Sequence, residues 1–138
     1  MYKLISATLL TTTLLLSTNN FSFAGTCASR CGPRPLEVKP GQYIRLQVVN
    51  KTYGPLKIED VQARKQMTLE SGKELQLDQA GATEPNLSIL FWDEDGRSLQ
   101  GVVSKPNPWI LRLEIRPSNR YPSDRSLYIL NDGRVNVF

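Results

Sequence analysis

The chain has 138 residues, a formal net charge of +4 and no histidine. This length is typical of a single domain that buries a core of its own. The missing histidine excludes catalysis by an imidazole base, Ser-His-Asp triads and metal sites that recruit imidazole ligands.

Residues 1–24 have the pattern of a secretory signal peptide. Lys3 is their only charge, Leu4–Leu16 form an apolar run broken only by Ser and Thr, and Ser22-Phe23-Ala24 places small residues at a cleavage site. The run is shorter than the about 20 residues of a membrane-spanning helix. We expect cleavage after residue 24, a mature chain with no transmembrane segment, and a periplasmic or secreted location. Retention as a signal anchor is the alternative.

Cys27 and Cys31 are the only cysteines in the chain, and they predict one small disulfide. Exported proteins enter an oxidising environment in which disulfides persist, so two thiols four residues apart pair most simply with each other. This bridge would tie down an N-terminal arm, residues 25–35, whose Gly and Pro residues disfavour regular structure. Two alternatives stay open, a redox-active pair and a metal site without the usual histidine ligands.

From residue 36 onward, apolar and polar residues alternate with period two, which is typical of strands with one face in water. The one helical candidate is a turn near Asp60–Lys65. Eight to nine short strands with turn signals every 8–12 residues predict an all-β fold over residues 36–138, either a β-sandwich or a Greek-key barrel. We expect strands at Tyr43–Val49, Leu56–Glu59, Met67–Leu69, Glu74–Leu77, Leu87–Trp92, Ser98–Val103, Trp109–Arg116, Ser126–Leu130 and Arg134–Phe138.

Three of these segments carry finer expectations. Leu87–Trp92 is apolar on both faces and predicts a central strand covered on both sides. The turn Asp93-Glu94-Asp95-Gly96 predicts a hairpin with Ser98–Val103 as its return strand, because Gly accepts a positive φ. Trp109–Arg116 should point Trp109 and every second residue after it into the core. Trp92 is also expected in the core, unless one of the two indoles lines a ligand groove with Arg112, Arg116 or Tyr121.

The run Val38–Asn50, in which a Pro-Gly turn precedes a strand that closes on Asn, resembles the early strands of cupredoxin-like and immunoglobulin-like exported domains. The mature chain also resembles small uncharacterised exported proteins of cyanobacterial type, in particular over Gly81–Asp93 and Tyr128–Phe138. The resemblance implies a Greek-key β-sandwich and a shared lineage with these proteins, and it implies no known activity. Cupredoxins hold copper with two His and a Cys near their last strands, which this chain lacks there, so no cofactor is expected.

Basic residues dominate positions 97–138, whereas acidic residues dominate 66–96. This separation of charges reflects either an ordinary solvated surface or a basic face that binds an anionic group. We predict a non-catalytic binding or scaffold module for an anionic cell-envelope component or a protein partner; nucleic acid is not expected in this compartment. Loops carry binding sites disproportionately. The candidate contacts to anionic groups are Arg112, Arg116, Arg120 and Arg125, and the candidate ligand loop contains Asn119, Tyr121 and Asp124.

Two enzyme classes remain as alternatives. One is a hydrolase that uses the carboxylates of Glu84 and Asp93, which would have to lie about 5–10 Å apart as in glycosidases. The other is a thiol-disulfide redox protein that uses Cys27 and Cys31. The acidic turn 93–96 has oxygen ligands suited to calcium, but it lacks the spacing of an EF-hand loop. An ordinary turn explains its residues equally well.

Overall fold

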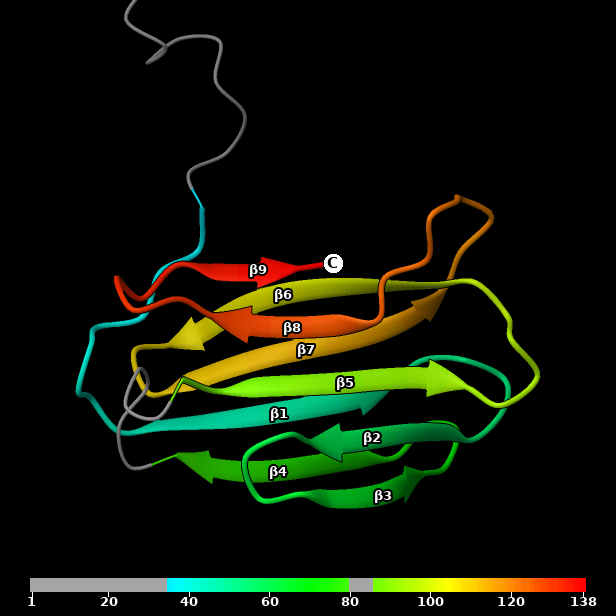
Figure 1. Ribbon diagram of the computed structural model, residues 1–138, viewed down its shortest axis with the longest axis horizontal. Coiled ribbons are helices and arrows are strands. Elements are labelled where there is room, and N and C mark those ends of the chain that lie inside the picture. Colours follow the sequence, from blue (N-terminus) through cyan, green and yellow to red (C-terminus); the bar gives the residue numbers. More distant parts are fainter. Residues whose placement is uncertain (1–34, 80–85) are drawn as a thin grey trace, which may run out of the picture. The chain divides into compact units, whose positions relative to one another are not determined.

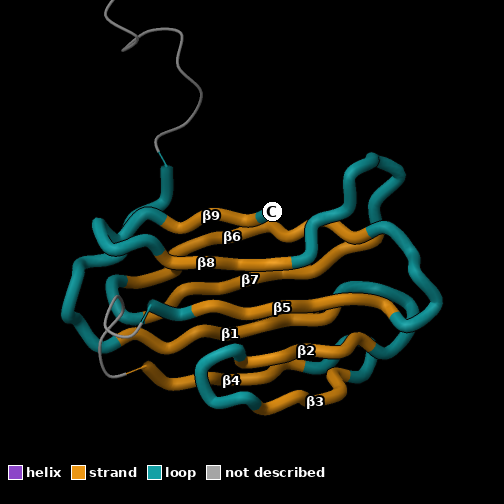
Figure 2. Tube along the Cα trace, in the orientation of Figure 1, coloured by secondary structure: helices purple, strands orange, loops and turns teal. Residues whose placement is uncertain are grey.

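The computed structural model describes residues 35–79 and 86–138, and this part of the chain contains nine strands and no helix (Figures 1 and 2). No helix long and apolar enough to cross a membrane therefore occurs among these residues. Each of the nine expected segments overlaps one strand. The strands are β1 (Ile44–Asn50), β2 (Leu56–Asp60), β3 (Lys65–Leu69), β4 (Glu74–Gln79), β5 (Ser88–Asp93), β6 (Leu99–Asn107), β7 (Ile110–Pro117), β8 (Ser126–Ile129) and β9 (Val135–Val137).

The strands form two sheets. One has four strands in the order β4-β1-β7-β6, and the other has five in the order β3-β2-β5-β8-β9. In Figure 1 the sheets lie one behind the other with their strands running in roughly the same direction. Neighbouring strands are antiparallel except for β1 and β7, which are parallel. The expected all-β class is confirmed, and the two sheets are consistent with a β-sandwich.

Alternate residues of the strands face a shared apolar core. Both sheets contribute to one continuous cluster of buried side chains, because period-two alternation sends every second side chain to the same face of a strand. The polar residues between them face water. Core residues from the four-stranded sheet include Ile44, Leu46, Val48, Leu111, Leu113 and Ile115, and those from the five-stranded sheet include Leu56, Ile58, Ile89, Phe91, Leu127 and Ile129.

Two expectations about aromatic and apolar residues are wrong. Strand β5 is central in its sheet, but it is covered on one face only: Ile89 and Phe91 are buried, whereas Leu90 is 37% exposed. Trp109 is 53% exposed because it lies in the turn before β7, which begins one residue later. Trp92 is partly buried. Neither indole is therefore fully enclosed in the core.

The expected hairpin between β5 and β6 is also wrong. Its turn forms as predicted, with a φ of 72° at Gly96 and a hydrogen bond of 3.0 Å from the Gly96 N–H to the carbonyl of Asp93. The two strands belong to different sheets, so the chain crosses from one layer to the other at this turn. The segment between β3 and β4 crosses in the same way. The hairpin of β8 and β9 and the turn at residues 61–64 are confirmed.

Candidate binding pocket beside the β7–β8 connection

The candidate site lies where β5 ends and β6 begins. Residues 94–98 join these strands, and residues 118–125 join β7 to β8. In Figure 1 the second connection is the orange loop that projects at the right, past the end of β7. The two connections enclose a hollow of about 240 Å³ that we call the arginine pocket. It is lined by Trp92, Asp93, Gly96, Arg97, Leu99, Ser123 and Arg125.

The connection 118–125 is fastened to the first residues of β6. The Asp124 N–H donates to the Leu99 carbonyl at 2.9 Å, and the Leu99 N–H donates to the Ser123 hydroxyl at 2.8 Å. A carboxylate oxygen of Asp124 accepts a hydrogen bond of 2.8 Å from the Gly101 N–H. At its far end, the Arg125 carbonyl accepts a hydrogen bond from the Phe91 N–H at 2.9 Å. These bonds fix the wall of the pocket that carries Arg125.

The carboxylates in and beside the pocket each have one partner within the turn itself. Asp93 is buried, and its Oδ1 accepts a hydrogen bond of 2.7 Å from the Asp95 N–H. The carboxylate of Asp95 pairs with the Arg97 guanidinium at 3.3 Å. The guanidinium of Arg125, by contrast, has no hydrogen bond or ion pair with any residue in 35–79 or 86–138. Its donors are therefore open to a ligand.

A smaller hollow of about 160 Å³ on the other side of the same connection contains Arg120. The backbone of Arg120 is held by hydrogen bonds with Ser98 and Ser118. Its guanidinium, like that of Arg125, has no bond to another residue of the described strands and loops. The two hollows share Leu99 in their linings. Two unpaired guanidinium groups therefore lie on one eight-residue connection.

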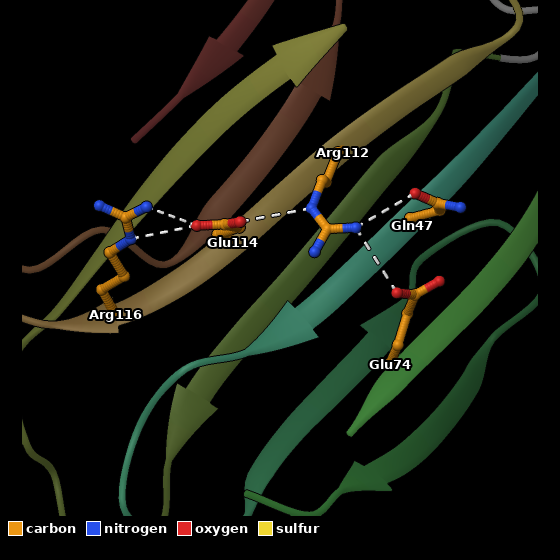
Figure 3. Close-up of polar contacts among 5 residues, drawn as sticks. All are labelled: Gln47, Glu74, Arg112, Glu114 and Arg116. Carbon is orange, nitrogen blue, oxygen red and sulfur yellow. Dashed lines mark hydrogen bonds and ion pairs between the residues drawn. The ribbon is translucent and has the colours of Figure 1, made fainter. Parts of the chain in front are cut away.

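Arg112 and Arg116 lie elsewhere, on the outer face of the four-stranded sheet (Figure 3). Glu114, between them on β7, pairs with Arg112 at 3.3 Å and with Arg116 at 2.5 Å. Arg112 also lies 3.6 Å from a carboxylate oxygen of Glu74 and donates to Gln47 at 3.5 Å. Two cations and two anions cancel here, so this outer-face cluster offers little net positive charge to an anion.

The charge pairing in this cluster predicts a pH effect for Glu114→Gln. The hydrogen bond from the Arg116 guanidinium, helped by Arg112, holds the pKa of the Glu114 carboxyl below its usual range. A carboxyl whose pKa is lower in the folded state adds stability above its unfolded-state pKa and loses it as the pH falls through the folded pKa. We expect the variant to be less stable at pH 7 by at most about 1 kcal/mol, as for exposed ion pairs.

The difference between Glu114→Gln and the parent should vanish in acid. Urea unfolding at several pH values between 7 and 3 measures it. A difference in unfolding free energy that stays constant over this range would contradict stabilisation by the ionised Glu114 carboxyl.

The remaining predicted site residues lie on the connection 118–125, at the end of β5, or outside the described residues. Asn119 and Tyr121 are exposed and do not line the arginine pocket, while the carboxylate of Asp124 accepts a hydrogen bond from the Gly101 N–H. Cys27, Cys31 and Glu84 lie outside the described residues. Asp93 is placed, and its Oδ1 caps the backbone of its own turn. No three His, Cys, Asp or Glu side chains gather as metal ligands would within the described part of the chain.

The sequence interpretation missed Arg97, and it placed Trp92 in a ligand groove only as an alternative to the core. Both follow from the crossing at residues 94–98, which brings this turn beside the connection 118–125 instead of placing it at the tip of a hairpin. A comparison with protein-family models finds no match, and comparisons with curated proteins and with solved structures find none either. The function must therefore be argued from the site alone.

Proposed function

We propose that this chain, after removal of residues 1–24, is an exported, non-catalytic binding module with a Greek-key β-sandwich, active in the periplasm or outside the cell. Its ligand is an anionic cell-envelope component, bound through the arginine pocket. The proposal rests on one observation: Arg120 and Arg125, on a fastened connection, present guanidinium groups with no acidic partner among the described residues. The leader pattern of residues 1–24 supports the location.

The chemistry of these groups favours a carboxylate or phosphate. A guanidinium forms paired, charge-assisted hydrogen bonds with the two oxygens of such groups. Trp92 adds an amphipathic surface beside Arg125 for the body of the ligand. The arginine pocket of about 240 Å³ is smaller than the about 300–1,000 Å³ that encloses a drug-sized molecule, so it suits one charged group of a larger polymer.

The hydrolase and redox alternatives receive less support. A carboxylate that caps its own turn, as Asp93 does, is poorly placed to act on a substrate, because its Oδ1 is already an acceptor. The cysteine pair that a redox function needs lies in the part of the chain the structure leaves undescribed. A protein partner with an acidic patch would use the same two arginines, and it is an outcome that the experiment below separates.

Binding of an anionic polymer should depend on Arg120 and Arg125 together. We expect polygalacturonate to bind the purified protein, and Arg120→Ala with Arg125→Ala to weaken that binding at least about tenfold, as loss of hydrogen bonds to charged groups does. Raising the salt concentration should weaken it further. Calorimetric titration measures both effects. Arg112→Ala is the matched control, since that guanidinium is already paired with Glu114.

Three further arms define the outcome. Dextran, which is uncharged, should not bind at the arginine pocket. Vesicles that contain phosphatidylglycerol separate a lipid surface from a polymer as the source of the anionic group. Binding that is unchanged both by salt and by Arg120→Ala with Arg125→Ala would overturn the proposal. Recovery of an acidic protein as the sole ligand in pull-downs from the native envelope would also overturn it.

A further inference from the structure

A third hollow lies at the end of β7 opposite the arginine pocket, and two exposed aromatic rings line it. Trp109 is 53% exposed and Tyr43 is 42% exposed. In Figure 1 this region is at the left, where β6 turns into β7. The hollow has a volume of about 190 Å³. We call it the aromatic groove, and its lining residues are Tyr43, Arg45, Asn107, Trp109 and Ile110.

The backbone around Trp109 holds the indole at the edge of the aromatic groove. The Trp109 N–H donates to Oδ1 of Asn107 at 2.9 Å, and the Trp109 carbonyl accepts a hydrogen bond of 2.7 Å from the Arg45 N–H. The turn is thereby tied both to the end of β6 and to β1. An apolar ring left in water costs solvation free energy, which a ligand that covers the ring would recover.

Three side chains beside the groove form a fixed polar rim. Asp78 on β4 accepts at Oδ1 from the Arg45 Nε at 2.7 Å and from the Tyr43 hydroxyl at 2.7 Å. These hydrogen bonds, that from Arg45 first, hold the pKa of the Asp78 carboxyl below its usual range, so the group stays ionised near neutral pH. Tyr43 and Arg45 are in turn oriented by Asp78.

The rim keeps unused hydrogen-bonding capacity on both partners of the ion pair. Oδ2 of Asp78 has only a long contact of 3.5 Å with the Arg45 Nη2. The second terminal nitrogen of Arg45, Nη1, has no partner among the residues that the structure describes. A free acceptor on Asp78 therefore lies beside free donors on Arg45, a residue that lines the aromatic groove.

We propose that the aromatic groove binds a single pyranose ring of a glycan. The C–H face of a sugar packs on an aromatic ring, and each sugar hydroxyl both donates and accepts a hydrogen bond, which matches Asp78 and Arg45 at once. The volume of about 190 Å³ is well below that of pockets for drug-sized ligands, in keeping with one ring. This inference does not rest on the proposed function, because the two sites share no residue.

The polar rim also discriminates against the other ligand class that aromatic grooves recognise. Proline-rich peptides dock between aromatic side chains, but their tertiary amides offer carbonyl acceptors and few N–H donors. Such a peptide would offer no donor to Oδ2 of Asp78, whose only contact is the long one of 3.5 Å with Arg45 Nη2, and would place carbonyl oxygens near it. The hydroxyls of a sugar have no such conflict.

The test uses the two tryptophans of the chain. In a Trp92→Phe variant of the full protein, Trp109 is the only indole, so its fluorescence reports on the groove. We expect saturable changes in its emission on addition of maltotriose, cellotriose or triacetylchitotriose. In the parent protein, Trp109→Ala and Asp78→Asn should each weaken trisaccharide binding at least about tenfold in calorimetric titrations. Tyr53→Ala is the matched control, because Tyr53 is an exposed aromatic residue outside the groove.

The outcomes separate the two sites. Binding lost in Trp109→Ala and Asp78→Asn but retained in Arg120→Ala with Arg125→Ala would support the aromatic groove, whatever the fate of the arginine pocket. Absence of binding to all three trisaccharides at about 10 mM would overturn the inference. It would also be overturned by binding that survives Trp109→Ala, or by a proline-rich peptide that binds at Trp109 in place of a sugar.

Discussion

Replacement of Asn50 by leucine is expected to lower the free energy of unfolding by about 3–5 kcal/mol. Asn50 is fully buried at the end of β1, and its side chain uses all of its hydrogen-bonding capacity. Its Nδ2 donates to the carbonyls of Gly54 and Leu69, both at 2.8 Å, and its Oδ1 accepts from the Thr52 N–H at 2.8 Å and the Thr52 hydroxyl at 2.7 Å. Leucine has a similar volume but leaves these groups unpaired.

The large effect has a structural reason. Residues 51–55 carry the chain from the four-stranded sheet to the five-stranded sheet, and residues 70–73 carry it back. The Asn50 side chain donates hydrogen bonds to the first of these connections, at Gly54, and to Leu69 at the end of β3. Its backbone is hydrogen-bonded to Gly72 and Lys73 in the second connection. Each buried polar group left unsatisfied costs about 1–3 kcal/mol.

Urea unfolding followed by circular dichroism measures this loss, provided the slope m is unchanged. Gln76→Ala is the control, because Gln76 is exposed on β4 and surface changes stay within about 0.5 kcal/mol. A loss below about 1 kcal/mol for Asn50→Leu would mean that water replaces the missing amide.

The second large effect is expected for Gly133→Ala, with a loss of about 3–5 kcal/mol. Gly133 has a φ of 91°, in the left-handed region that costs other residues about 1–2 kcal/mol. A Cβ at this position would also collide with the carbonyl oxygen of Val38. Relief of such a collision in a packed region costs about 1–3 kcal/mol more.

Gly133 is crowded because the segment before β1 packs along the start of β9. The Val38 N–H donates to the Gly133 carbonyl at 2.8 Å, and the Val135 N–H donates to the Leu36 carbonyl at 2.9 Å. A methyl group at 133 must push this segment away. The amides of Val38 and Val135 should therefore exchange hydrogen faster in Gly133→Ala than in the parent.

Two other glycines separate the backbone cost from the collision. Gly72 has a φ of 73° and open space around its Cβ position, so Gly72→Ala should show the backbone cost alone. Gly54 has open space and no positive φ, so Gly54→Ala should have little effect. The same urea titration ranks the three variants. Equal losses in Gly133→Ala and Gly72→Ala would refute the close contact with Val38.

The alternation of apolar residues located all nine strands, because burial against one core imposes the same period on every strand. The pairing of the strands was not accessible from the same pattern. The turn Asp93–Gly96 satisfies its own local bonds whether the next strand returns beside β5 or crosses to the other sheet. The alternation that includes Trp109 also continues one residue beyond the strand, so it cannot distinguish a core indole from an exposed one.

The candidate sites also differ in how much of them the local sequence predicts. Arg120 and Arg125 stood out because they lie in a long polar loop, a local feature of the sequence. Pairing of Arg112 and Arg116 with Glu114 was also readable, since residues two apart on a strand share a face. The aromatic groove joins residues far apart in the chain, such as Tyr43 and Trp109, and only the sheet topology brings them together.

The parallel pairing of β1 with β7 has a consequence for the order of folding. It joins residues about 65 positions apart, as Arg45 and Ile110 are, and it lies at the centre of its sheet. This sheet cannot be completed until the ribosome has passed Pro117. Chains dominated by such distant contacts fold in milliseconds to seconds rather than microseconds. The four-stranded sheet of a nascent chain therefore stays incomplete until 117 of the 138 residues have been made.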